Sequence, residues 1–71
     1  MKKNIVIFDI DLDGNRAFEI EHPDDNKCTM RLDHATRFTV AEAKVYLADH
    51  RGLKVATIEA VKVSIRLARA V

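Results

Sequence analysis

The chain has 71 residues, of which 48% are hydrophobic and 32% are charged, and its formal net charge is +1. A chain of this length makes one domain with a modest core, with little room for the deep, water-excluding pocket that most enzymes need. The composition excludes a disordered segment, and the near-neutral charge is far from the strongly basic balance of a typical nucleic-acid binder.

The N-terminal sequence and the cysteine content bear on where the protein works. The first apolar run stops at Asp9, too early for a signal peptide, and no segment approaches the roughly 20 apolar residues of a membrane span. Cys28 is the one cysteine, which fits a reducing compartment. We therefore expect a single cytoplasmic domain over residues 1–71, with no membrane partner.

The first part of the chain has the period-two pattern of strands. Residues 5–12, 16–22 and 27–33 predict three strands, separated by turn signals at residues 13–15 and 23–26. The first strand has one face made of Val6, Phe8, Ile10 and Leu12. A three-residue loop would set Ile10 opposite Phe18 and Phe8 opposite Ile20. These segments predict a three-stranded antiparallel meander.

A helix is expected over residues 40–50. Thr39 and Glu42 have the spacing of a capping box, and Phe38 before it could pack on Ala43. Gly52 suits the left-handed position just past the helix end. The face expected to pack on the sheet consists of Val40, Ala43, Tyr46 and Leu47.

Residues 55–70 carry two competing patterns. Residues 61–67 alternate like a strand, whereas Glu59, Lys62, Arg66 and Arg69 are spaced as one stripe of a helix. The apolar side of that helix would be formed by Ala56, Ala60, Val63 and Leu67. The fold class expected is α+β, a three-stranded antiparallel meander followed by a helix and then a second helix or a fourth strand.

Two short patterns in residues 5–20 are typical of catalytic or metal sites. Asp9, Asp11, Asp13 and Gly14 match the start of an EF-hand loop, but the twelfth position is Ile20 instead of Glu. Residues 5–11 are an apolar strand with two Asp residues, and they resemble the first motif of haloacid-dehalogenase-type phosphatases. That family builds its site on a larger doubly wound domain with later Lys and Asp motifs, for which this chain has no room.

Other combinations of reactive residues also fail to form a known motif. His22, Cys28, His34 and His50 are separated by 6, 6 and 16 positions, whereas zinc sites usually have two close pairs. The sequence contains no nucleophile–base pair and no Gly-rich phosphate loop. We therefore expect no enzyme: no catalytic residue, no metal ligand and no cofactor.

Residues 47–61 place Ala48, Gly52, Leu53, Ile58 and Val61 at distinctive spacings. This segment resembles the helix-turn-helix of lactose-repressor-type DNA-binding proteins, although Arg51 stands where that pattern usually has a small or apolar residue. The resemblance implies a recognition helix that would present Lys54, Val55, Ala56, Thr57 and Lys62 to DNA. A generic helical hairpin or a helix–loop–strand is the other interpretation of the same residues.

Two groups of residues are candidates for a protein interface. Ile5 and Ile7 lie on the face of the first strand opposite Phe8, and a sheet covered on one side would leave them exposed. Lys62, Arg66 and Arg69 form a basic stripe. This stripe lies in the basic half of the chain, since residues 34–71 carry seven bases and three acids, against five and eight in residues 1–33.

We therefore expect a small, non-enzymatic regulatory module that binds a macromolecular partner, a protein rather than DNA, with a homodimer as a further option. Domains of this size are common among phage and mobile-element accessory proteins, including inhibitors that act by occupying the surface of a partner. The alternative is a helix-turn-helix DNA-binding regulator.

Overall fold

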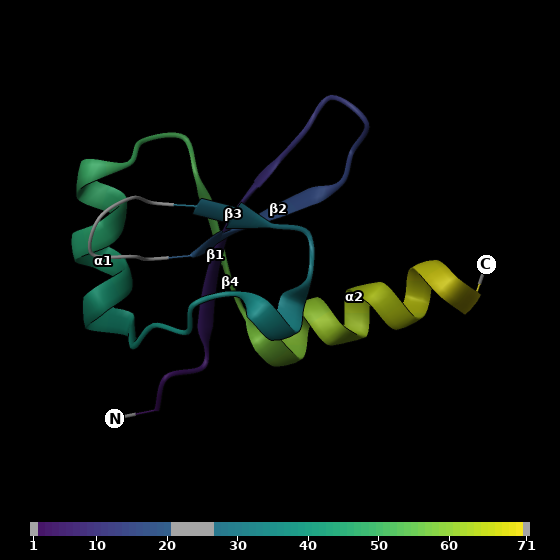
Figure 1. Cartoon of the computed structure of the whole chain (residues 1–71). Helices are drawn as coiled ribbons and strands as arrows, with labels where there is room; N and C mark the ends of the chain where they lie inside the picture. Colours follow the sequence, from purple (N-terminus) through teal and green to yellow (C-terminus); the bar gives the residue numbers. More distant parts are fainter. Residues whose placement is uncertain (1, 21–26, 71) are drawn as a thin grey trace.

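The computed structural model describes residues 2–20 and 27–70 and shows an α+β fold, as predicted (Figure 1). The strands are β1 (Ile5–Ile10), β2 (Arg16–Ile20), β3 (Lys27–Thr29) and β4 (Lys54–Thr57). The helices are α1 (Val40–Asp49), α2 (Ile58–Ala70) and a short 3-10 turn, η1 (Leu32–His34). The strands form one antiparallel sheet in the order β3-β2-β1-β4.

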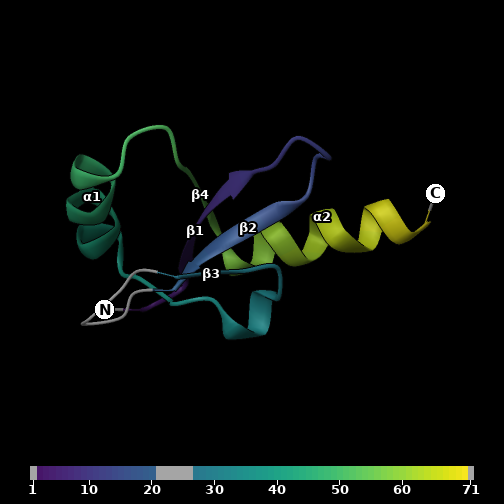
Figure 2. The ribbon, with the colours of Figure 1, turned by 45° about the horizontal axis from the view of Figure 1, so that its top comes forward.

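The two helices pack on opposite faces of the sheet. Ile5 and Ile7 pack with Phe38 and with Ala43 and Tyr46 of α1, forming one apolar cluster. Their strand neighbours point the other way and pack with α2. That second cluster contains Val6, Phe8, Phe18, Ala35, Ile58 and Val61. In Figures 1 and 2 the strands accordingly lie between α1 and α2.

This arrangement corrects the prediction that Ile5 and Ile7 face solvent. Ile7 is 0% exposed and Ile5 is 9% exposed, so both belong to the core. The prediction assumed a sheet covered on one face only. In the structure the chain passes through β4 at the edge of the sheet, which lets the helices before and after it cover opposite faces. Ile5 and Ile7 are therefore not a contact surface.

The segment predicted as either helix or strand contains both. Lys54–Thr57 pairs with β1 in a register that sets Val55 opposite Ile7 and Ala56 opposite Val6. Strand becomes helix at Thr57, whose hydroxyl accepts a hydrogen bond from the Ala60 backbone N–H at 3.1 Å, as an N-cap does. The helix-turn-helix alternative for residues 47–61 is not formed, because the residues that would begin its recognition helix are a strand. The other interpretation of this segment, a helix, a loop and a strand, is what the structure has up to Thr57.

The face that α2 presents to the sheet also differs from the prediction. Ile58 and Val61 are buried and Ile65 is half-buried against them. Of the residues expected to form the apolar side of the helix, Ala60, Val63 and Leu67 are exposed, and Ala56 lies in β4, half-buried against the core. Ile58, Val61 and Ile65 follow the spacing i, i+3, i+7 and carry larger side chains, so that face buries more apolar surface.

The β1–β2 hairpin pairs in a different register from the one predicted. Phe8 lies opposite Phe18, and Ile10 lies opposite Arg16. The connecting loop is longer than expected because the Asp11 carboxylate accepts hydrogen bonds from the N–H groups of Asp13, at 3.0 Å, and Asn15, at 2.8 Å. These bonds begin the turn at Asp11, a residue that was predicted to lie in the first strand.

The N-terminus of α1 is confirmed in detail. Thr39 Oγ1 accepts from the Glu42 N–H at 3.1 Å, and the Glu42 carboxylate accepts from the Thr39 N–H at 2.9 Å. Ala43 and Tyr46 are buried and Leu47 is half-buried, as expected, but Val40 is exposed. Gly52 has φ +87°, which confirms its left-handed conformation after the helix.

Candidate functional site

α2 carries exposed apolar and basic side chains outside the stripe that packs on the sheet. We call the exposed residues Lys62, Val63, Arg66, Leu67 and Arg69 the outer face of α2. Val63 is 51% exposed and Leu67 is 64% exposed. Residues four apart in a helix are neighbours, so these two side chains form one apolar strip. The basic residues lie along one side of that strip. Lys62 and Arg66 each come directly before one of the two apolar residues, so both are rotated from the strip in the same direction around the helix.

Only the first part of α2 is held by the core. Ile58 and Val61 are buried and Ile65 is half-buried, whereas the side chains from Arg66 to Arg69 are all exposed. The C-terminal part of α2 extends beyond the sheet in both ribbon views (Figures 1 and 2). A helix that projects in this way presents its outer face without obstruction from the described residues.

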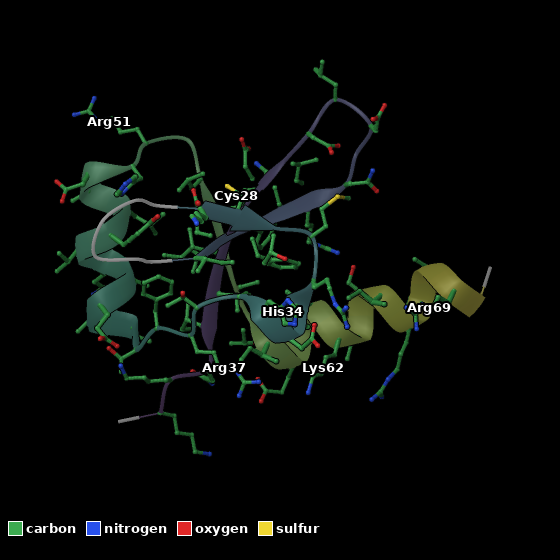
Figure 3. All side chains as sticks on the ribbon, viewed as in Figure 1. Cys28, His34, Arg37, Arg51, Lys62 and Arg69 are labelled. Atoms are coloured by element: carbon green, nitrogen blue, oxygen red, sulfur yellow. The ribbon has the colours of Figure 1, made fainter. Side chains whose placement is uncertain are left out.

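The basic side chains of this face have no acidic partner among the residues that the structure describes. The ion pairs found there join Lys3 to Glu42, and Asp33 to Arg31 and His34. In Figure 3, Lys62 and Arg69 extend toward the same side of the molecule. The three predicted stripe residues are thus placed on one helix surface, with their charges available to an outside partner.

The structure does not place the other predicted DNA-contact residues on the same helix surface as the basic stripe. Lys54, Val55, Ala56 and Thr57 form the edge strand β4, and only Lys62 lies on α2. The sequence reasoning missed Val63 and Leu67 as surface residues. The available signal was that α2 carries two apolar stripes, at Ile58-Val61-Ile65 and at Val63-Leu67, and one sheet face can bury only one of them.

A hollow of about 300 Å³ lies between the β1–β2 hairpin and α2. It is lined by Gly14, Asn15, Arg16, Phe18, Met30, Ser64, Ile65 and Ala68. The Arg16 guanidinium donates to Ser64 Oγ at 2.9 Å and lies over the Phe8 ring, 5.4 Å from its centroid. Arg16 Nε is buried and has no hydrogen-bond partner among the described residues. The contacts of Arg16 mainly attach the hairpin to α2.

Asp9, Asp11 and Cys28, which were weighed for metal binding or catalysis, have hydrogen-bond partners in the structure. Asp11 closes the hairpin turn, and Asp9 Oδ1 accepts from the Ile10 N–H at 2.9 Å. The Cys28 thiol donates to Glu19 Oε2 at 3.3 Å. Local desolvation, reinforced by that bond and by the Glu19 charge, raises the pKa of the exposed Cys28 thiol.

No cluster of three potential metal ligands occurs within residues 2–20 and 27–70. Cys28, His34 and His50, which were weighed as zinc ligands, lie within this range, and His22 lies outside the described residues. His50 stacks on Tyr46, with 4.1 Å between the ring centroids.

In comparisons with known proteins, no family model matches this chain, and no curated protein or solved structure shows a significant match. A search of the described helices finds none that is both long and apolar enough to span a bilayer.

Proposed function

We propose that this protein is a small, non-enzymatic binding module that uses the outer face of α2 to occupy the surface of a partner protein. The observation that carries the proposal is the exposure of Val63 and Leu67 beside three cations that make no ion pair with any described residue, on a helix whose other side is already buried in the core. A helix presenting apolar anchors at i and i+4 is a common element of protein recognition.

The chemistry of the face indicates the kind of partner surface that it fits. Val63 and Leu67 would fill an apolar groove, since removal of apolar area from water contributes about 25 cal/mol per Å². Lys62, Arg66 and Arg69 would meet acidic residues at the rim of that groove, where charges mainly raise the association rate and select the partner. By covering such a surface the protein would act as a steric regulator or inhibitor.

The proposal is tested by isolating proteins that co-purify with the wild-type chain and comparing their affinities for variants. We expect the double variant Val63→Ser and Leu67→Ser to bind at least about tenfold more weakly, because full burial of a valine or leucine side chain contributes about 1.5–3 kcal/mol. Val45→Ser is the matched control, because Val45 is an exposed valine on α1, which covers the other face of the sheet. Circular dichroism should show that all variants remain folded.

Two results would overturn the proposal. One is a specific partner whose affinity is unchanged by the double serine variant. The other is binding to random-sequence DNA with a steep salt dependence that charge reversal of Lys62 and Arg66 abolishes, since phosphate contacts release counterions. That second result would identify the basic stripe as a nucleic-acid surface.

A further inference from the structure

β4 is the last strand at one end of the sheet, and the direction of its backbone groups follows from the neighbouring pairs. Ile5 exchanges both backbone hydrogen bonds with Phe38, at 3.0 and 2.8 Å. The polar groups of Ile5 therefore point away from β4, so Ile5 and Thr57 are a non-hydrogen-bonded pair of the antiparallel ladder.

The alternation of the ladder then applies to the rest of β4. Val55 is two residues from Thr57, so its N–H and C=O also point away from β1. The described residues provide no hydrogen-bond partner for these groups or for the Thr57 N–H. β4 thus offers the donors and the acceptor that an additional strand needs.

An apolar hollow of about 190 Å³ lies beside these groups, between β4 and α1. It is lined by Ile5, Val40, Ala43, Lys44, Leu47 and Val55. Val55 points toward it because Val55 lies opposite Ile7, whose side chain belongs to the α1 face of the sheet. A strand placed next to β4 would direct every second side chain to this same face.

The other face of the edge has a different character. Lys54 is exposed and lies opposite Phe8, so its side chain is on the α2 face. Alternate side chains of an added strand would therefore contact an apolar surface on the α1 face of the sheet and a lysine on the α2 face. Lys44 lines the hollow, so a second positive charge lies near the same edge on the α1 face.

We propose that β4 binds an extended segment of a partner protein as a fifth strand, with an apolar side chain in the hollow beside α1 and an acidic side chain next to Lys54. Main-chain bonds would supply affinity and the hollow would supply side-chain selectivity, as in other complexes formed by strand addition. This surface is distinct from the outer face of α2. A second copy of the chain fits less well, because its own Lys44 and Lys54 would bring like charges to the seam.

The test uses a capped peptide of about eight residues in which Glu alternates with Leu, titrated into the ¹⁵N-labelled full chain. We expect backbone shifts to centre on Val55, Thr57 and Leu47. A peptide of the same composition with its Glu and Leu residues in two separate blocks is the control for nonspecific binding. It should bind weakly, because it cannot direct Leu to one face and Glu to the other.

Two changes then isolate the backbone contact. Val55→Pro removes an outward N–H without breaking a bond to β1, and Val55→Ala keeps that N–H while shortening the side chain. We expect the proline variant to bind the peptide roughly fivefold to tenfold more weakly than the alanine variant, as for loss of one backbone hydrogen bond. If Val55→Pro does not fold, the wild-type protein is titrated instead with a peptide that is N-methylated at its pairing residues. We expect this peptide to bind more weakly than the parent peptide by the same factor.

The proposal is overturned by three outcomes. They are shifts that centre on α2, an N-methylated peptide that binds as tightly as the parent, and no binding of the alternating peptide. Sedimentation of the free protein tests whether a second copy of the chain occupies β4 instead. Self-association that Val55→Pro abolishes, together with no peptide binding, would assign β4 to that second copy.

Discussion

Arg16 and Ser64 join the β1–β2 hairpin to α2, since Arg16 Nη2 donates a hydrogen bond to Ser64 Oγ at 2.9 Å across a sequence separation of 48. Arg16 begins β2 and Ser64 lies in the middle of α2. The same guanidinium covers the Phe8 ring at 5.4 Å. The hairpin thereby holds α2 at the point where the helix leaves the sheet, which helps to set the direction of its outer face.

Removal of this contact should loosen the attachment of α2. We expect Ser64→Ala to lower the free energy of unfolding by about 1 kcal/mol, the usual net value of one hydrogen bond. Arg16→Ala should cost about 1 kcal/mol more than Ser64→Ala, because it also removes the contact with Phe8. Urea denaturation of both single variants and the double variant measures the coupling. Strictly additive effects would show that the bond contributes nothing.

The burial of Ile7 predicts a large cost for its truncation. Ile7 is 0% exposed between β1 and α1, so Ile7→Ala should destabilise the protein by about 2–5 kcal/mol through lost transfer energy and a cavity. Leu67→Ala is the matched control and should change stability by less than about 0.5 kcal/mol, since Leu67 is largely exposed. Thermal and urea unfolding report both values. Similar small effects for the two variants would place Ile7 on a surface.

Gly52 should resist replacement for conformational reasons alone. Its φ is +87°, and a Cβ built there meets no atom within 4 Å. Gly52→Ala is therefore expected to cost about 1 kcal/mol from backbone strain, without any steric clash. Gly52→Asn is the informative comparison, because Asn tolerates the left-handed region better than Ala. Equal stability of wild type and the alanine variant in urea would contradict the left-handed conformation.

Glu42 should make stability depend on pH in the acid range. The backbone N–H of Thr39, followed by the Lys3 ammonium, lowers the pKa of Glu42 in the folded chain. A lowered folded-state pKa means that the stabilisation is fully present above the unfolded pKa of about 4.3 and is lost as pH falls through the folded value. Glu42→Gln keeps an acceptor for the Thr39 N–H but cannot titrate.

The measurement is the urea midpoint between acid and neutral pH for wild type and Glu42→Gln. The wild-type curve should rise more steeply with pH over the acid range than that of the variant. Parallel curves would show that Glu42 has the same pKa in the folded and unfolded states.

Several features of this protein follow from the sequence by local physical chemistry. The sequence predicted three local features, each of which depends on a few adjacent residues: the Thr39–Glu42 capping box, the turn at Gly14 and the left-handed Gly52. The α+β class and the helix over residues 40–49 follow from the same kind of evidence, as does the existence of the hairpin. The three cations of the α2 stripe were also identified from their spacing.

The choice of buried face was decided only by the tertiary structure. Residues 5–8 are apolar on both sides of β1, so their pattern could not tell whether one or two helices cover the sheet. That depended on the insertion of β4 beside β1, a pairing between residues about 50 positions apart in the chain. Once Ile58 and Val61 were buried, Val63 and Leu67 had to face outward, because a helix packed on one sheet face buries only one side.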